Sequence, residues 1–190
     1  MRSANRPMPL VRAALLKDAP AIAEIYAPIV RDTSISFEID PPDAELMAER
    51  IRGGSATHPW LVAELDGMVV GYAYASRFRD RPAYRWSVEV SAYVSESMRG
   101  RGIGRSLHQA LLEILQRQGF RSAFAGIALP NPASVAMHEA VGFTLLGVYR
   151  EVGFKHGRWH DVGWWRRGLS EALAIPAEPI PFASLSSRGL

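Results

Sequence analysis

The sequence predicts a single α/β domain in which helices flank a mixed, mostly antiparallel central sheet. Two β-rich runs within residues 60–78 meet at Asp66-Gly67, a dipeptide typical of a two-residue hairpin turn. Residues 87–94 alternate between apolar and polar side chains, which is the period of a strand. From residue 107, apolar side chains recur every three or four positions, which is the period of a helix. A chain of 190 residues with this pattern has the size of one globular domain.

Two helices are expected before the hairpin. Asp18 can cap a helix over residues 18–30, and Pro20 fits this helix because it falls in the first turn. The apolar side chains at helical spacing are Ile22, Ile25, Tyr26 and Ile29. Residues 43–52 predict a second, more polar helix that ends at Gly53 and Gly54.

The strand over residues 87–94 has two different faces. The face expected to point into the core carries Val88, Val90, Ala92 and Val94. The opposite face, expected to be polar, carries Ser87, Glu89, Ser91 and Tyr93. A helix that begins near residue 104 and stops at Gly119 should follow this strand.

The remaining elements alternate between strand and helix. A strand is expected over residues 121–128, followed by a short helix that Asn131 caps, with Pro132 at its first position, and that ends near residue 140. Two further strands should cover residues 143–150 and 161–167. The end of the chain is rich in proline and serine without periodicity, so an extended tail is expected. We divide the chain into an N-terminal extension (1–9), one domain (10–169) and this tail (170–190).

Composition excludes several classes of function. Lysine and arginine number 22 against 19 acidic residues, so a net charge of +3 gives little support to nucleic-acid binding. The absence of cysteine excludes disulfides, cysteine-ligated metals and a catalytic thiolate. The first residues lack the apolar stretch of a signal peptide, and no run approaches the roughly 18 apolar residues of a membrane span. We therefore expect a cytoplasmic protein without a nucleic-acid partner, a membrane partner or a metal site.

The segment RGRGIGR, between the strand and the helix that follows it, predicts an anion site. Free backbone N–H groups and the positive end of a helix dipole meet there, glycines allow close approach, and arginines add charge. The candidate binding residues are Arg99, Gly100, Arg101, Gly102, Ile103, Gly104 and Arg105. A P-loop would need lysine and serine or threonine after the last glycine, and a dinucleotide fingerprint would need GxGxxG, so both are disfavoured. A tight turn with solvated arginines is the alternative.

The segment "RGRGIG" after "VSAYV" resembles the pyrophosphate loop of the GCN5-related N-acetyltransferases (GNAT), which bind acetyl-CoA there. The segments "FRDRPAYRWSVEVSAYV", "LPNPASVAMHEAVGF" and "REVGFKHGRWHDVGWW" resemble the phosphinothricin and methionine sulfoximine N-acetyltransferase branch. The resemblance covers about residues 10–168 and implies the GNAT fold. It also implies that Ala92, Tyr93 and Val94 contact the acetyl group and pantetheine arm, and that Asn131 reaches the same arm.

Acetyl transfer from a thioester to an amine has three needs: a neutral amine, a stabilised tetrahedral oxyanion, and a way to protonate or tolerate the departing thiolate. Without cysteine, direct attack in a ternary complex is the simpler hypothesis. Glu89 is the candidate base, at the position that matches the family's base, and partial burial would have to raise its pKa from the usual 4.3 or so. A solvated strand glutamate is the alternative. His138 stands where many relatives carry a tyrosine thought to protonate the thiolate, and it is the candidate acid, although a packed structural histidine fits as well.

A cationic and aromatic cluster precedes the Glu89 strand and predicts the acceptor site. Its candidate residues are Phe78, Arg79, Arg81, Pro82, Ala83 and Tyr84, to which the resemblance adds Phe37. An arginine fork binds carboxylate or phosphinate bidentately, which suits a small amino acid with acidic groups. Solvated loop arginines are the alternative. The resemblance further implies that Lys155 helps close the substrate side, whereas Lys155 and His160 otherwise read as ordinary surface residues.

The sequence therefore predicts an N-acetyltransferase that uses acetyl-CoA and acetylates the α-amine of phosphinothricin, methionine sulfoximine or a related analogue. The resemblance implies a homodimer. An acetyltransferase for another small amine or a protein N-terminus, and a non-catalytic acyl-CoA-binding protein, are the alternatives. The physiological acceptor does not follow from the sequence.

Overall fold

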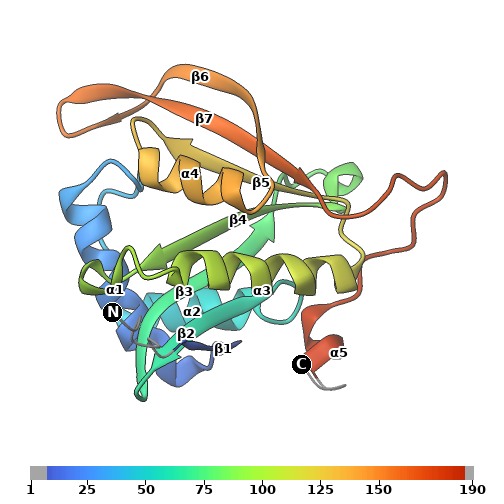
Figure 1. The fold of residues 1–190 in the computed structure, drawn as a ribbon, viewed down its shortest axis with the longest axis horizontal. Coiled ribbons are helices and arrows are strands. Elements are labelled where there is room, and N and C mark those ends of the chain that lie inside the picture. Colours follow the sequence, from blue (N-terminus) through green and yellow to red (C-terminus); the bar gives the residue numbers. More distant parts are fainter. Residues whose placement is uncertain (1–7, 187–190) are drawn as a thin grey trace, which may run out of the picture.

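The computed structural model describes residues 8–186, so the expected N-terminal extension (1–9) lies outside it apart from its last two residues, as do the last four residues of the tail. Seven strands form one sheet in the order β1-β2-β3-β4-β5-β7-β6 (Figure 1). The strands are β1 (Leu10–Ala13), β2 (Trp60–Leu65), β3 (Met68–Arg77), β4 (Ser87–Val94), β5 (Ser122–Ala128), β6 (Thr144–Lys155) and β7 (Arg158–Gly168). Only β4 and β5 pair in parallel. The mixed, mostly antiparallel sheet is confirmed.

Helices cover both faces of this sheet (Figure 1). They are α1 (Ala19–Asp32), α2 (Ala44–Gly54), α3 (Ile103–Gln118), α4 (Pro132–Ala140) and α5 (Phe182–Ser186). One core joins α3 to the central strands, and a second core joins α1 and α2 to β2 and β3. Each core buries aliphatic and aromatic side chains on its own side of the sheet, which is how an open sheet protects both faces from water.

Local signals in the sequence explain several boundaries. Asp66 and Gly67 both have positive φ (52° and 77°), which is the geometry of the expected two-residue hairpin turn. Helix α3 ends at Gly119, whose φ of 88° is the left-handed cap conformation. Asn131 caps α4, because its Oδ1 accepts a hydrogen bond from the backbone N–H of Ser134 at 3.1 Å.

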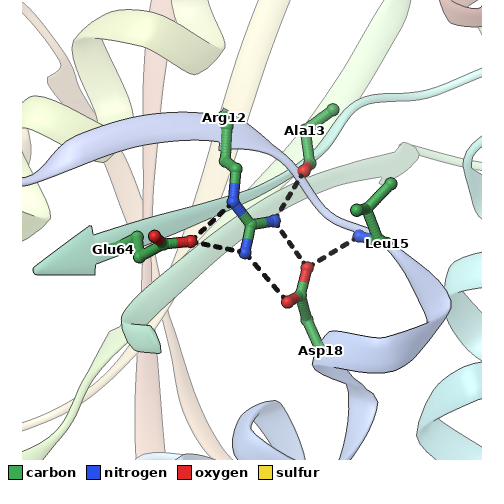
Figure 2. A network of polar contacts seen from close by, with 5 residues as sticks. All are labelled: Arg12, Ala13, Leu15, Asp18 and Glu64. Carbon is green, nitrogen blue, oxygen red and sulfur yellow. Dashed lines mark hydrogen bonds and ion pairs between the residues drawn. The ribbon is translucent and has the colours of Figure 1, made fainter. Parts of the chain in front are cut away.

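The expectation that the Asp18 side chain caps α1 is wrong. Its carboxylate makes no bond to the start of the helix and instead accepts from Arg12 Nη1 at 2.7 Å and Nη2 at 2.9 Å, and from Leu15 N at 2.8 Å. Arg12 also donates to Glu64 at 2.8 Å (Figure 2). A bidentate charge-assisted pair is stronger than a cap bond, so the carboxylate turns toward β1. This network joins β1, β2 and the start of α1.

The structure adds or lengthens strands that the sequence pattern did not resolve. Strand β1 was not expected, since four residues are too few to show a period. Strands β6 and β7 meet at His156-Gly157, both with positive φ, and so extend beyond the expected ranges of 143–150 and 161–167. An irregularity between Tyr149 and Gly153 disguised the alternation of β6. Helix α2 also runs through Gly53 and Gly54 rather than ending before them.

The second face of β4 is less polar than expected. The ring of Tyr93 packs 4.8 Å from the ring of Tyr26 and 5.3 Å from that of Tyr72, inside the second core. Glu89 and Ser91 share this face but lie nearer the other end of the strand. Thus one face of β4 serves both a core and a polar site.

The C-terminal tail is only partly extended. Residues 182–186 form α5, in which Phe182 and Leu185 are buried. These two side chains explain the docking, because each removes apolar surface from water. Within residues 8–186, every helix is too short or too polar to cross a bilayer.

Candidate functional site

Strands β4 and β5, in the middle of the sheet, are paired over only part of their length. Their parallel ladder pairs only Ser87–Glu89 with Ser122–Phe124, although β4 continues to Val94 and β5 to Ala128. Beyond Glu89 the facing edges of the two strands are therefore free of each other (Figure 1). Ala92, Tyr93 and Val94, which are expected to contact the acetyl group and pantetheine arm, lie on the β4 side of this gap. Unpaired N–H groups at such an edge can donate to an inserted acyl arm.

Glu89 lies at the point where the ladder ends. Its carboxylate is half-buried and makes no hydrogen bond or ion pair with any residue between 8 and 186. Burial raises the pKa of Glu89, and the positive charge of Arg79 partly offsets this increase. A carboxylate with a raised pKa and no partner is a stronger base than a solvated glutamate. This favours a catalytic Glu89 over an ordinary solvated strand glutamate.

Aromatic rings surround the position of Glu89. The ring of Phe78 stacks on the ring of Phe124, the register partner of Glu89, at a centroid distance of 4.1 Å. The guanidinium of Arg79 lies 4.2 Å above the Phe78 ring and 5.4 Å from Trp164. The indole Nε1 of Trp164 is buried without an acceptor in the part of the chain that the structure describes. These contacts hold the Arg79 cation where its charge acts on Glu89.

Four of the seven predicted acceptor residues line one cavity of about 330 Å³, which we call the arginine cavity: Arg79, Arg81, Pro82 and Tyr84. Ser87, on the same face of β4 as Glu89, lies in its wall. The other walls come from the end of β3, the turn before β2 and the C-terminal tail. Arg81 has no ion pair or hydrogen bond from its side chain among the described residues. Arginines outnumber the two acidic residues of the lining, Asp80 and Glu178, and Ser87 places the cavity two residues along β4 from Glu89. The cavity can therefore take an anionic group.

The other three predicted acceptor residues do not line this cavity. Phe37 packs against the β6–β7 hairpin, where a Cβ on Gly153 would come within 2.1 Å of its ring, and its centroid is 6.0 Å from that of His160. Ala83 is exposed in the short turn beside the cavity. The third, Phe78, stacks on Phe124 next to the position of Glu89.

The interpretation of Lys155 and His160 as ordinary surface residues is wrong. Lys155 is 5% exposed, and its Nζ donates to the carbonyls of Val30 at 2.5 Å and Ser36 at 2.8 Å. His160 is 4% exposed and bonds to the Lys155 carbonyl at 3.0 Å. The β6–β7 hairpin folds over the segment after α1, and this long-range contact buries both side chains.

The glycine-arginine turn has the geometry of an anion site. Gly100 and Gly102 have φ of 73° and 80°, which side chains with a Cβ rarely adopt. Gly102 precedes α3, and the N–H groups of Ile103, Gly104 and Arg105 find no acceptor within the described residues. Arg99, Arg101 and Arg105 are exposed and unpaired there, whereas the Ile103 side chain is buried in the core. These donors fit a diphosphate.

His138 sits inside the molecule rather than on an open wall. Its Nδ1 donates to the Ser134 carbonyl at 2.8 Å, which leaves Nε2 without a proton in the neutral ring. Its ring meets the ring of His108 edge-on at 4.7 Å, and Nε2 of each is buried without a partner among the described residues. Burial lowers the pKa of His138 and lowers that of His108 to about 3.

Sequence reasoning missed Phe124, Trp164 and His108. Phe124 meets Glu89 only through the β4–β5 register, which no local pattern encodes. His108 faces His138 across two helices, and its place on the buried stripe of α3 was the available signal. No group of three acidic or histidine residues in the described chain is arranged to hold a metal ion.

Comparison with known proteins gives consistent matches. The family model for the acetyltransferase (GNAT) domain matches residues 11–164. Phosphinothricin N-acetyltransferase from Streptomyces viridochromogenes is 38% identical over 95% of this chain and 96% of that protein. The L-methionine sulfoximine/L-methionine sulfone acetyltransferase of Salmonella typhimurium is 34% identical over 88% of this chain and 98% of its own. A phosphinothricin acetyltransferase from Sinorhizobium meliloti, solved with acetyl-CoA, has 40% identity and a TM-score of 0.87 over 92% of this chain and 96% of its own.

Proposed function

This chain belongs to the GNAT acetyltransferase family, and on that premise we propose that it acetylates the α-amine of phosphinothricin, methionine sulfoximine or a related amino-acid analogue. It is an acetyl-CoA-dependent N-acetyltransferase. The observation that carries the choice of acceptor is the pairing of a partnerless carboxylate, Glu89, with a cavity that presents Arg79 and Arg81. The relatives named above act on acceptors of this class, which supports the choice.

We propose that the diphosphate of acetyl-CoA binds the turn from Arg99 to Arg105. The three free N–H groups at the start of α3 would donate to it, and the arginines would screen its charge. The acyl arm would lie along the β4 edge at Ala92, Tyr93 and Val94, with Asn131 at the opposite side of the gap. The acetyl thioester supplies an activated carbonyl carbon.

The chemistry proposed for this chain is direct transfer. Glu89, alone or through one water, takes a proton from the acceptor ammonium, so that the nitrogen lone pair is free to form the new C–N bond. After attack, the C–S bond breaks and the thiolate leaves; the nitrogen, now part of the amide, releases its second proton to solvent, and the thiolate takes up one proton. Backbone N–H groups of β4 beyond Glu89 stabilise the carbonyl oxygen while it gains negative charge. No covalent enzyme intermediate is needed.

His138 enters the proposal as the group that could protonate the leaving thiolate. In the neutral ring its proton lies on Nδ1, which is bonded to Ser134, so donation from Nε2 requires the imidazolium. Burial opposes that charged form. The contacts support packing against His108 more than acid catalysis, and we place solvent ahead of His138 as the proton source.

We propose a homodimer in which the β6–β7 hairpin meets a second copy. Six apolar side chains there are each more than half exposed: Leu145, Leu146, Tyr149, Val152, Phe154 and Trp159. Apolar surface of this extent on one hairpin is typical of an interface. Sedimentation velocity should give twice the monomer mass, and Phe154→Glu should shift the protein toward the monomer.

The function is tested by thiol release from acetyl-CoA with a panel of amino acids, the two analogues and short peptides. We expect turnover of phosphinothricin or methionine sulfoximine, and a fall in kcat of about 100-fold or more in Glu89→Gln. Affinity for acetyl-CoA should stay unchanged in this variant, which serves as the control for folding. Wild-type rates in Glu89→Gln would remove the base, turnover of peptides alone would favour the protein N-terminus, and no turnover would favour a binding protein.

A further inference from the structure

Residues 177–181, which we call the strap, lie against the arginine cavity. Glu178, Pro179, Ile180 and Pro181 all contribute to its wall. The match to the family model ends at residue 164, so the strap lies beyond the matched domain. The strap and the cavity arginines belong to segments almost a hundred residues apart, and Figure 1 shows the C-terminal segment running down this end of the molecule.

The far end of the strap is fixed to the body of the protein. Gln118 is fully buried, and its Nε2 donates to the carbonyls of Ile180 at 2.7 Å and Thr57 at 2.8 Å. The Ile180 N–H donates in turn to the Gln118 carbonyl at 2.7 Å. Phe182, the next residue after the strap, is buried in the core. This end of the strap therefore has little freedom to move.

The near end of the strap holds the loop that carries the cavity arginines, residues 78–86. Trp86 Nε1 donates to the Ala177 carbonyl at 2.8 Å. Arg85 forms an ion pair with Glu178 at 2.8 Å, and its guanidinium also lies 4.2 Å from the Trp86 ring. The strap thus connects the arginine loop to Gln118 at the end of α3.

The loop needs such a support because its own bonds are local. Tyr84 N donates to Arg81 and Arg85 N to Pro82, and the described hydrogen bonds of residues 79–84 reach no further than this loop. Arg79 and Arg81 are both exposed. Arg79 stacks on Phe78 and Trp164, but Arg81 has no described side-chain bond, so the strap is the long-range support of this part of the loop.

We propose that the strap is a specificity determinant: it positions the arginine loop and closes the cavity, so that acceptors of single-amino-acid size bind and peptides do not. This rests on the proposed function, since it takes the arginine cavity as the acceptor site. The volume of about 330 Å³ lies at the small end of ligand pockets. Pro179 and Pro181 make a stiff wall, because the proline ring fixes φ. A peptide chain leaving the cavity would meet this wall.

The test uses the full chain with two variants. The triple variant Pro179→Gly/Ile180→Gly/Pro181→Gly loosens the wall but keeps the backbone bonds to Gln118, whereas Glu178→Gln removes only the ion pair. Glu171→Gln, an exposed glutamate on the same tail and outside the cavity, is the matched control. KM for the acceptor, KM for acetyl-CoA, kcat for a dipeptide and amide hydrogen exchange in residues 78–86 are measured for each.

In the triple variant we expect KM for the analogue to rise about tenfold, dipeptide turnover to appear and exchange in residues 78–86 to accelerate. Glu178→Gln should raise the same KM two- to fivefold, as befits an exposed pair. Acetyl-CoA KM should stay constant, and Glu171→Gln should match the wild type. Unchanged acceptor KM and unchanged exchange in the triple variant overturn the strap proposal. If the wild type acetylates no analogue, the proposed function fails, and the exchange rates of residues 78–86 still decide whether the strap holds the loop.

Discussion

Asp18 and Glu89 are two carboxylates that are partly or fully removed from water but differ in their hydrogen bonding. Asp18 is 5% exposed and accepts three hydrogen bonds, two from the Arg12 guanidinium and one from Leu15 N. Glu89 is half-buried with no described partner, and only the more distant charge of Arg79 favours its ionised form. The pKa of Asp18 is therefore lowered, chiefly by its bond to Arg12, while burial raises that of Glu89.

The difference teaches that burial alone does not define the role of a charged side chain. The hydrogen bonds of Asp18 fix its charge and join three elements, so this carboxylate stabilises the fold (Figure 2). The Glu89 carboxylate keeps its lone pairs free, which destabilises its ionised form and increases its basicity. The two regions can be compared directly by experiment.

The largest expected effect is on the pH dependence of catalysis. Because ionised Glu89 is the proposed base, kcat/KM should fall about tenfold per pH unit below the pKa of Glu89, which lies above the ordinary glutamate value. Removal of the Arg79 charge in Arg79→Gln should move this acidic limb to higher pH. Initial rates between about pH 5 and 8 check the prediction. A limb at the same pH in Glu89→Gln would assign it to another group and break the comparison.

The next effect is on stability at the Asp18 network. Asp18→Asn should lower the free energy of unfolding by about 2–3 kcal/mol, because Arg12 loses the bidentate one of its two carboxylate partners in a half-buried site and keeps only Glu64. Urea denaturation measures this, and kcat per folded molecule should not change. Asp32→Asn is the matched control, since its pair with Arg31 is exposed and should contribute nothing measurable.

The Asp18 network also predicts the direction in which the free energy of unfolding changes in acid. The pKa of Asp18 is lower in the folded chain than in the unfolded chain, so its contribution is complete above about pH 4 and is lost as the pH falls below that value. Asp18→Asn should therefore flatten the stability profile in acid. An unchanged slope would show that Asp18 is not the titrating group.

The smallest effect is a gain in stability at the active site. The folded pKa of Glu89 is raised, so ionisation at neutral pH opposes folding. Glu89→Gln should raise the free energy of unfolding by about 0.5–1 kcal/mol at pH 7 while it abolishes most activity. The gain should shrink as the pH falls and Glu89 becomes protonated. A loss of stability at pH 7 would mean that Glu89 has a structural partner after all.

Sequence reasoning succeeded where one segment encodes its own geometry. The alternation of residues 87–94 gave the bounds of β4, and the period after residue 103 with Gly119 gave α3. Asp66-Gly67 defined a hairpin because both residues tolerate positive φ. The family motifs singled out the Gly-Arg turn, Glu89 and the arginine loop, whose roles stay predictions.

It failed where distant segments decide the outcome. Phe124 lies beside Glu89 only because a parallel ladder sets its register across α3. Lys155 is buried because the β6–β7 hairpin covers the carbonyls of Val30 and Ser36, which accept hydrogen bonds from its Nζ. Both acceptors lie more than a hundred residues away in the sequence, so no local pattern predicts them. The Asp18 carboxylate binds Arg12 of β1 rather than the start of α1 for the same reason. The strap has no periodicity at all, so its role as a wall of the arginine cavity could be read only from its contacts.

Tyr93 links the two sides of the sheet in a way that can be observed without a label. Its main chain borders the gap between β4 and β5, while its ring is packed against the rings of Tyr26 and Tyr72. A molecule that inserts into the gap and shifts this strand alters the asymmetric surroundings of a tyrosine cluster. The near-ultraviolet circular dichroism of these tyrosines should then change as the gap is filled, even if the coenzyme does not contact the tyrosine rings.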